Sequence, residues 1–521
     1  MSATVGIAGA GTFGPMLKEF YQGPVAEQIN NRVWMREYFQ KRSKGWSGKQ
    51  MVIPIHVGRN TGVGFSSEAG AGATGGFLPT AGAQGYRDLR INAHSSYGRF
   101  QVSGVAMDTA TKSGVGAFAG VMNEEMDRLV RDISNNENSM NIFGGATKGF
   151  LNQRRATPNN SGNGGQTAAG GSGEMANPAI WEYQGDFSYF DGSRTGLAVN
   201  PAVAASWIPI ELVDMNTYEL IPITQVGGAA TTNGNFFVTD FSADQTNPTI
   251  TIRFGQDTAA VGTFTTANVG GSRAIAVRIK ANQSTDSTGG GGAGGAAFGQ
   301  NPTTWTGATG AQNIINNQVI GLFENLASQT HFGVARNDTV ATGDDLDQRL
   351  LKSTVITHDN TTAGGAVPGQ RDNAGADLSL ERLQYMMDIL QQNAGVDANV
   401  MVMSALMRHR YTVQLTGTMG VQSNVVVSGD NGKLMDNQQS LAYGGIKFQY
   451  DRQFPVATIG LLHTDDWILA ELATGQFADE DGNILFRVQN QDAYEGFWKH
   501  RYNIACKRPN AQLLLTGITP T

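Results

Sequence analysis

From Ala117 to Gly144, apolar side chains recur at the 3.6-residue period of an α-helix. At roughly 1.5 Å per residue, this segment predicts a helix about 40 Å long, well above the usual length in globular proteins. Asp127 and Arg131 form an i,i+4 pair of opposite charge on its outer face. We interpret the segment as a long structural helix.

A second pattern precedes this helix. The stretch KQMVIPIHVGRN (49–60) and the stretch YRDLRINAHSSYGRFQVSG (86–104) alternate apolar and polar residues as β-strands do. Residues 61–85 join them and are too rich in Gly and Ala to pack a core. The pattern predicts an extended β-arm with little core of its own, stabilised by lying on another subunit.

Residues 205–283 contain short alternating strands at close spacing, separated by Gly, Asn and Asp turns. This pattern predicts a small β-barrel or sandwich. Polar Gly-rich stretches at 157–178 and 284–300 bracket it. The β module therefore reads as an insertion into a larger domain.

The rest of the chain alternates helix and strand patterns. Residues 378–395 predict a helix that stops at Gly395, residues 399–404 a buried strand, and residues 405–415 a further helix. The chain then becomes rich in strands, with a hairpin-turn signal at Asp481-Gly482. The expected fold class is α+β.

Composition limits the function classes. The chain of 521 residues has 68 glycines and only 16% charged residues, well below the roughly 25% usual for soluble domains, so neighbouring subunits are the simplest cover for its surface. The net charge of −7 argues against a bulk cationic nucleic-acid binder but is compatible with DNA as an enclosed cargo. No apolar run approaches the length of a membrane span, and no signal peptide precedes the start, so we expect a protein made in the cytosol.

The one cysteine, Cys506, cannot form an intrachain disulfide, and we expect it to be a buried, inert thiol in a reducing compartment.

Gly9, Gly11 and Gly14 match the G-x-G-x-x-G fingerprint of dinucleotide-binding folds. The fingerprint needs a buried strand before it and a helix after it, but only Val5 and Ile7 are apolar before it. The helical run after it stops at Gly23-Pro24. The flanks favour a flexible Gly-rich N-terminus over a dehydrogenase.

Other candidates for chemistry are incomplete. His463, Asp465 and Asp466 have no G-x-S-x-G nucleophile elbow to accompany them, and we interpret them as a surface turn. Asp479, Asp481 and Asn483 alternate as in a calcium loop, but Ile484 and Asn490 stand where an EF-hand needs Gly and Glu. The acidic residues of 342–348 are interpreted as a solvated loop. We therefore expect no catalytic residues, no cofactor and no metal.

The order of these elements carries a family resemblance. First comes an amphipathic, mildly basic arm at residues 15–44, followed by the long β-hairpin and the helix beginning AFAGVMNEEMDRLVRDI. After them come the inserted β module, the segment LQYMMDILQQNAGVDANVMVMSALMRHRY and the terminal strands NQDAYEGFWKHRYNIACKRPNAQLLLTGI. In this order the chain resembles tailed-bacteriophage major capsid proteins of the Hong Kong phage capsid fold.

The resemblance implies a set of domains. They would be an N-terminal arm (1–44), an E-loop (45–104), a P domain with its spine helix (105–156), a connection into the A domain (157–204), the inserted β domain (205–283), a Gly-rich linker (284–300), the A domain (301–475) and the P-domain return strands (476–521).

The resemblance also implies a function without catalysis. Copies of the chain would form pentamers and hexamers that close into an icosahedral shell around double-stranded DNA, with the E-loop and the N-terminal arm lapping over neighbours. Implied partners are a separate scaffolding protein, a portal and a decoration protein, and the location would be the virion capsid, assembled in the host bacterial cytoplasm. Some relatives crosslink an E-loop lysine to a neighbour's asparagine. No lysine lies between Lys49 and Lys112 here, so that chemistry is expected to be absent.

Three alternatives stay open. An encapsulin-type nanocompartment shares the fold and would hold a cargo enzyme in place of DNA. A phage fibre would explain the glycines but not the helix at 117–144. An NAD-dependent oxidoreductase is the enzymatic alternative.

Overall fold

The structure of the chain is a computed structural model. It describes residues 33–60, 62–64, 81–105, 115–144, 147–154, 179–185, 187, 190–191, 198–200, 208–214, 223–224, 230–231, 235–244, 248–255, 275–279, 319–327, 330–332, 334–336, 351–357, 378–418, 442–456, 458–479, 485–488, 491–516 and 518. All of the described residues belong to one compact unit, which spans residues 32–521.

A five-stranded sheet forms the first layer of the described fold. Its strands are β1 (Ser43–Gly45), β20 (Trp467–Phe477), β22 (Ala493–Cys506) and β21 (Phe486–Arg487), in that order, with β4 (His94–Ser103) also paired to β22. The central strand β22 is 14 residues long and pairs antiparallel with both β20 and β4. The sheet therefore combines segments from both ends of the chain.

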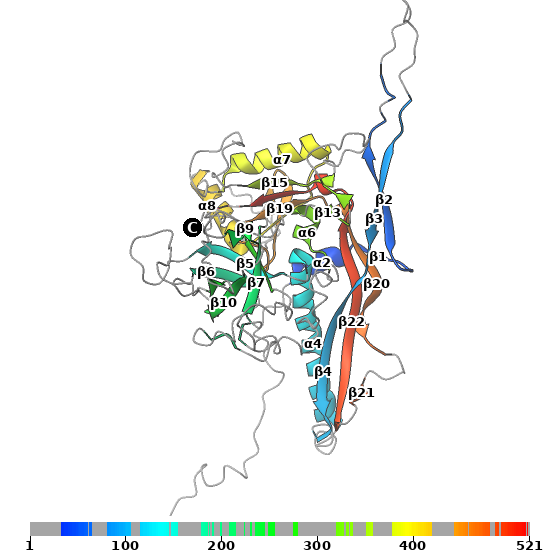
Figure 1. Ribbon diagram of the computed structural model, residues 1–521, viewed down its shortest axis with the longest axis vertical. Helices are drawn as coiled ribbons and strands as arrows, with labels where there is room; N and C mark the ends of the chain where they lie inside the picture. Colours follow the sequence, from blue (N-terminus) through cyan, green and yellow to red (C-terminus); the bar gives the residue numbers. More distant parts are fainter. Residues whose placement is uncertain are drawn as a thin grey trace, which may run out of the picture. The chain divides into compact units, whose positions relative to one another are not determined.

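Helix α4 (Val115–Phe143) packs along β4, beside β22 (Figure 1). It corresponds to the helix predicted near 117–144. Close approach to the sheet is possible because β4 carries Gly98, where an added Cβ would lie 2.2 Å from Cδ1 of Ile133 on α4. The short helix α2 (Trp34–Gln40) also contacts α4, and its aromatic side chains pack into the same core.

Six strands close into a barrel. They are β10 (Asn235–Ser242), β11 (Thr249–Gly255), β6 (Ala179–Gly185), β5 (Thr147–Arg154), β12 (Ile275–Ile279) and β7 (Ile208–Asp214), in that order. Four of them lie in the predicted module at 205–283, but β5 and β6 lie outside it. The predicted boundary at 205 thus differs from the structure. The sequence between β5 and β6 is rich in Gly and is interpreted as a linker, so the pattern does not assign these two strands to the β module. The small pair β8 (Ile223–Thr224) and β9 (Ala230–Thr231) forms a separate sheet.

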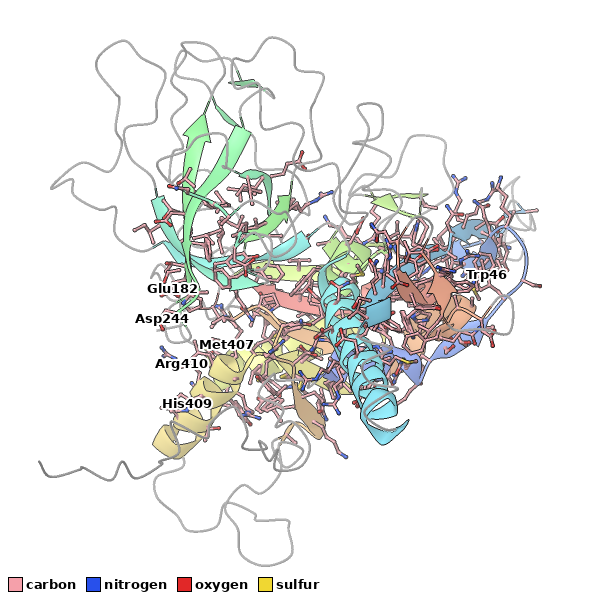
Figure 2. The ribbon with its side chains drawn as sticks, turned by 90° about the horizontal axis from the view of Figure 1, so that it is seen from below. Trp46, Glu182, Asp244, Met407, His409 and Arg410 are labelled. Carbon is pink, nitrogen blue, oxygen red and sulfur yellow. The ribbon has the colours of Figure 1, made fainter. Side chains whose placement is uncertain are left out.

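A six-stranded mixed sheet forms the remaining layer. Its order is β15 (Thr354–Thr357), β23 (Leu513–Thr516), β19 (Ile459–Leu462), β16 (Val400–Met403), β18 (Ile446–Tyr450) and β17 (Ala442–Tyr443). Helices α7 (Leu380–Ala394) and α8 (Ala405–Thr418) pack against it. On α8, Met407 is buried and His409 is exposed (Figure 2).

The predicted boundary between 301–475 and 476–521 is corrected by strand pairing. β20 begins at Trp467, inside the first range, but pairs with β22 of the second range. β23 lies in the second range, but pairs with β15 and β19 of the first. The chain crosses between the two sheets twice, and pairing between distant strands leaves no local signal in the sequence.

The predicted β-arm is shorter than expected. β2 (Met51–Gly58) and β3 (Gly85–Ile91) form an antiparallel two-stranded sheet, called here the hairpin, whereas β4 leaves it to join β22. Pro54 is tolerated in β2 because a two-stranded sheet leaves one edge of each strand unpaired. Asn92 and Ala93, between β3 and β4, therefore connect the hairpin to the five-stranded sheet.

The remaining short elements complete the core. They are α6 (Leu322–Ala327), β13 (Thr330–His331) paired with β14 (Val334–Ala335), and the 3-10 turns η7 (Thr464–Asp466) and η8 (Pro509–Ala511). One apolar cluster joins α2, α4, α6 and both large sheets, a second fills the barrel, and a third lies between α7, α8 and the six-stranded sheet.

Candidate functional site

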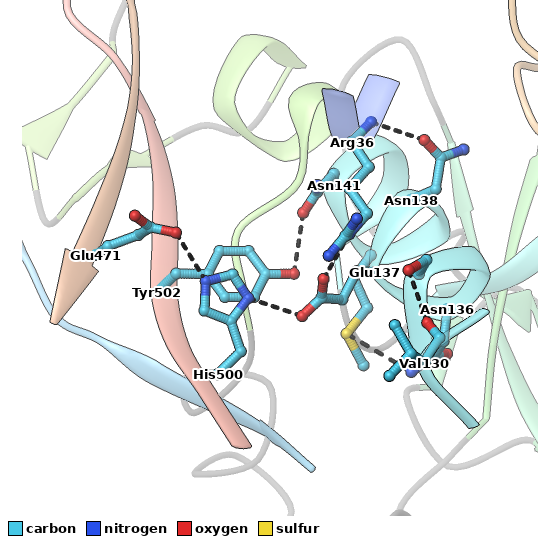
Figure 3. A network of polar contacts seen from close by, with 11 residues as sticks. Arg36, Val130, Asn136, Glu137, Asn138, Asn141, Glu471, His500 and Tyr502 are labelled. Carbon is cyan, nitrogen blue, oxygen red and sulfur yellow. Dashed lines mark hydrogen bonds and ion pairs between the residues drawn. The ribbon is translucent and has the colours of Figure 1, made fainter. Parts of the chain in front are cut away.

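A buried polar network ties four distant segments together (Figure 3). His500 of β22 lies between two carboxylates, with Nδ1 2.8 Å from Glu137 Oε1 on α4 and Nε2 2.9 Å from Glu471 Oε1 on β20. Arg36 of α2 donates from Nε to the other oxygen of Glu137 at 2.7 Å. His500 and Glu137 are almost fully buried. A carboxylate buried this deeply requires such partners, so the network fixes α2 and α4 to the sheet.

The charges of the network support one another. Burial acts to lower the pKa of His500, but its hydrogen bonds to Glu137 and Glu471 and their charges outweigh burial and raise that pKa. The hydrogen bond from His500, followed by that from Ser43, lowers the pKa of Glu471. Tyr502 stacks on the His500 ring, with centroids 4.2 Å apart, and donates to Asn141 at 3.0 Å. The arrangement favours a charged imidazolium held between two carboxylates.

Asp451 forms a second buried node beside the first. Its Oδ2 accepts the backbone N–H of Met35 at 3.0 Å, and both of its oxygens lie 3.1 Å from Nδ2 of Asn138. Oδ1 of Asn138 in turn accepts the N–H of Arg36 at 2.8 Å. Burial raises the pKa of Asp451, and the bonds from Gln453, Met35 and Asn138 act to lower it. Asp451 and Asn138 thus satisfy the first N–H groups of α2, which a helix start leaves unpaired.

Neither node has the composition of a catalytic centre. The two carboxylates bind opposite nitrogens of His500, and among the described residues no three His, Cys, Asp or Glu side chains gather in a way that could hold a metal ion. The His500 ring bonds to these two carboxylates and packs against Trp498 and Tyr502. The network is a structural clamp.

These contacts correct the predicted N-terminal arm. Residues 34–44 of the predicted arm lie on their own chain, through α2 and through β1, which pairs in parallel with Leu469 to Glu471 of β20. The amphipathic pattern predicts a helix with one apolar face, but it does not distinguish packing on the same chain from packing on a neighbouring subunit. The part of the arm before residue 33 lies outside the described residues.

The hairpin presents the other candidate surface. Its inner side buries Ile55, Val57, Leu89 and Ile91 against the rest of the chain. Its outer side exposes Val52 and Tyr86, which retain 50% and 64% of their surface. His56 lies opposite Tyr86 in the register, with ring centroids 5.3 Å apart. The same face also carries the exposed charged side chains of Asp88 and Arg90, opposite Pro54 and Val52. A two-stranded sheet has little core of its own and is typically stabilised by packing against another surface, so this mixed face is a candidate for contact with another chain.

The structure separates the residues predicted to form a surface turn. His463, Asp465 and Asp466 lie in or beside η7, and Asp465 is exposed. Asp466, however, is buried, and its Oδ2 lies 2.8 Å from Nδ1 of His463. The prediction of a surface turn is therefore wrong for Asp466, whose buried carboxylate is stabilised by this partner.

Other predicted candidates have mixed outcomes. Cys506 is buried as expected, and burial raises the pKa of its thiol strongly. Asp479 is exposed beyond the end of β20. The remaining candidates lie outside the described residues: Gly9, Gly11, Gly14, Asp481, Asn483 and residues 342–348.

Sequence reasoning missed the residues of both nodes. A signal existed for Glu137, because the polar run SNNEN interrupts the apolar face of a long helix. His500 lies between Lys499 and Arg501 in a strand, and the alternation places it on the same face as Trp498 and Tyr502 but does not identify its partners.

Comparisons with known proteins give likenesses of structure only. No protein-family model matches the chain, and no curated protein matches its sequence. A chain of the cyanophage A-1(L) capsid asymmetric unit is 12% identical, with 97% of this chain and 98% of that chain covered and a TM-score of 0.48. A chain of the capsid of a native GTA particle is 8% identical, with 99% and 100% covered and a TM-score of 0.43. A chain from Microbacterium phage Oxtober96 is 10% identical, with 98% of each chain covered and a TM-score of 0.40.

Two of these structures are described as capsids, of a cyanophage and of a GTA particle. None of the described helices combines the length and the hydropathy needed to cross a bilayer.

Proposed function

We propose that the chain is the major capsid subunit of a phage-type particle and that its copies assemble as pentamers and hexamers into an icosahedral shell around double-stranded DNA. The observation that carries this proposal is the two-sided hairpin. Its inner side packs on its own chain, and its outer side exposes Val52 and Tyr86. A surface of this kind gains stability when a neighbouring copy covers it.

The buried network supports the same proposal. A shell subunit has to keep its fold while neighbouring subunits press on it. In this chain, the buried contacts of Glu137, His500 and Asp451 join segments from both ends of the sequence. Closed symmetry then multiplies individually weak contacts between copies into a durable shell. The role is structural, and no step of catalysis is part of it.

In this proposal the parts of the fold take the roles that the resemblance implies. The five-stranded sheet with α4 would be the P domain, the six-stranded sheet with α7 and α8 the A domain, and the hairpin the E-loop. The barrel would be an additional domain inserted between them. Contacts of the N-terminal arm with neighbours would rest on residues before 33, because residues 34–44 dock on their own chain.

The proposed partners follow from the same role. Copies of the chain would assemble in the cytoplasm of the bacterial host with a separate scaffolding protein, and the finished virion capsid would carry a portal and a decoration protein. DNA would be enclosed without recognition of its sequence.

Negative-stain electron microscopy of the purified full chain tests the proposal, alone and with the proteins encoded beside it. Uniform polyhedral shells or six-fold capsomers are expected. Discrete particles of one to four subunits under all conditions would overturn it. Nuclease-protected DNA in particles from infected cells supports a capsid, whereas a cargo enzyme in its place would identify an encapsulin-type compartment.

A matched pair of variants tests the hairpin. Val52→Asp places a charge on its outer face, and Val413→Asp places the same charge on a valine of α8 of similar exposure, 53% against 50%. Both variants should unfold at the temperature of the wild type, since neither side chain is buried. We expect Val52→Asp to lose shells and Val413→Asp to keep them, and equal yields of shells from the two would contradict the role of the hairpin.

A further inference from the structure

A cationic pocket lies where four segments of the described chain meet, and the proposed function does not use it. Its volume is about 310 Å³, at the lower end of the usual range for ligand pockets. It is lined by Arg42, Ser43, Lys44, Thr464, Asp465, Trp467, Ile468 and Lys507. Three of these side chains are cationic and one is acidic, although the whole chain carries a net charge of −7.

The pocket holds its arginine in a fixed position. Nε of Arg42 donates to the carbonyl oxygen of Thr464 at 2.7 Å, and Nη1 donates to the carbonyl oxygen of Tyr38 at 2.5 Å. The guanidinium carbon lies 3.9 Å from the centre of the Tyr38 ring. The two hydrogen bonds and the stacked Tyr38 ring fix the guanidinium group, while its other N–H groups can donate to a ligand. Because the side chain is already fixed, little side-chain entropy is lost when a ligand binds.

The two lysines are positioned by their backbones. Lys44 lies in β1, opposite Ala470 of β20, and the N–H of Lys507 donates to the carbonyl oxygen of Asp466 at 2.8 Å. Within the described part of the chain, no ion pair joins Arg42, Lys44 or Lys507 to a carboxylate. The pocket therefore gathers three positive charges that no described carboxylate pairs with.

The acidic lining residue does not cancel this field. Asp465 is exposed and accepts a long bond, 3.4 Å, from the hydroxyl group of Thr464. Its charge reduces the positive potential of the pocket, but its carboxylate forms no ion pair with the described cations. Replacing it should therefore strengthen the binding of an anion.

We propose that this pocket binds a phosphate group of the nucleic-acid backbone, so that each subunit contacts the enclosed DNA without reading its sequence. The inference rests on the proposed function as a shell around DNA. An arginine fork and two lysines are the side chains that phosphate oxygens favour. The duplex offers such groups in a regular row, and each contact releases condensed counterions.

A salt series measures this contact in the full chain. Fluorescence anisotropy follows the binding of a 20-base-pair duplex of random sequence to the wild type, to Lys44→Ala/Lys507→Ala and to the control Lys41→Ala/Lys49→Ala. The control removes two exposed lysines that do not line the pocket. We expect the pocket variant to bind more weakly, with a slope of log K against log salt smaller by about 1 to 2, and the control to differ less. Equal slopes for the pocket and control variants would overturn the proposal.

Two further measurements separate the sources of the anion. Asp465→Asn should bind the duplex more tightly than the wild type. Inorganic phosphate is tested separately, through the unfolding temperature of the wild type and of Lys44→Ala/Lys507→Ala. If phosphate raises the unfolding temperature of the wild type alone, while both proteins bind the duplex with the same affinity, the pocket binds free phosphate and the assignment to DNA is wrong.

The outcome for shells distinguishes this site from the proposed function. If the wild type forms no shells yet binds the duplex through Lys44 and Lys507, the shell function fails and the phosphate site stands. If shells form, Lys44 and Lys507 should acetylate more slowly in DNA-filled particles than in empty ones, with Lys41 unchanged. If the pocket variant binds the duplex as the wild type does but forms no shells, the occupant is a carboxylate of a second copy and the proposal is wrong.

Discussion

Nδ1 of His500 lies 2.8 Å from Oε1 of Glu137, although the two residues are 363 positions apart in the chain. The second ring nitrogen of His500 contacts Glu471, so one imidazole joins α4 to two strands of the five-stranded sheet. Arg36 approaches Glu137 from the other side at 2.7 Å. The long helix is therefore fixed to the sheet by charge as well as by apolar packing.

The first prediction concerns the pH dependence of stability. The folded pKa of His500 is raised above its ordinary value of about 6.5, so its contribution is fully present below that pH and is lost as pH rises through the folded value. The folded pKa of Glu471 is lowered, so its contribution is present above about 4.5 and is lost as pH falls through the folded value. We expect His500→Gln to lower the free energy of unfolding at pH 6 by about 1–3 kcal/mol.

Thermal unfolding between pH 6 and 8.5 checks this prediction. The wild type should lose more stability over this range than His500→Gln does. His409→Gln, at an exposed position of α8, is the control and should follow the wild type (Figure 2). Parallel curves for the wild type and His500→Gln would mean that the pKa of His500 is the same in the folded and the unfolded chain, and would contradict the prediction.

The second prediction concerns the contact of α4 with β4. An added Cβ at Gly98 would lie 2.2 Å from Cδ1 and 2.7 Å from Cγ1 of Ile133. Gly98→Ala should therefore lower the free energy of unfolding by about 1–3 kcal/mol, the usual cost of overpacking. Ile133→Ala alone should lower it by about 2–4 kcal/mol by leaving a cavity.

The double variant separates this contact from independent effects. Because the alanine methyl group at position 98 would enter the space that Ile133 vacates, Gly98→Ala/Ile133→Ala should be more stable than the sum of the two losses implies. Urea unfolding of the four proteins gives the coupling. Strict additivity would show that the two elements do not pack as described.

The parts of the fold that the sequence predicts well are those with local signals. Helix α7 begins after Ser379, whose side chain accepts the N–H of Arg382 at 3.2 Å, and ends at Gly395 with φ of 64°. Both signals lie within a few residues of the helix. The α4 pattern is likewise contained in its own segment, so its bounds are predicted closely.

The parts that the sequence does not predict depend on distant partners. β5 and β6 belong to the barrel because they pair with each other and with β12 and β11, and nothing near residue 147 indicates those partners. Asp451 follows a strand and resembles a turn residue, yet it binds Met35 at 3.0 Å from 416 positions away. The clamp is visible only once the chain has brought these segments together.

The third prediction concerns Cys506. The thiol is fully buried, and burial raises its pKa strongly, so the reactive thiolate form is scarce in the folded chain. We expect no alkylation by iodoacetamide at pH 8 in the native protein and one alkyl group per chain in urea. Intact-mass spectrometry counts the groups. Rapid labelling without denaturant would mean that the C-terminal end of β22 opens in the folded state.

The last prediction concerns covalent crosslinks between subunits. In some members of the family that the sequence resembles, an E-loop lysine forms an isopeptide bond with an asparagine of a neighbour. Here no lysine lies between Lys49 and Lys112, and the hairpin strands β2 and β3 carry only arginine as a cationic residue. An arginine guanidinium stays protonated and does not act as the amine nucleophile that such a bond requires. Boiled and reduced shells should therefore run as one band near 55.4 kDa in a denaturing gel. A ladder of covalent multimers in such a gel would contradict the prediction.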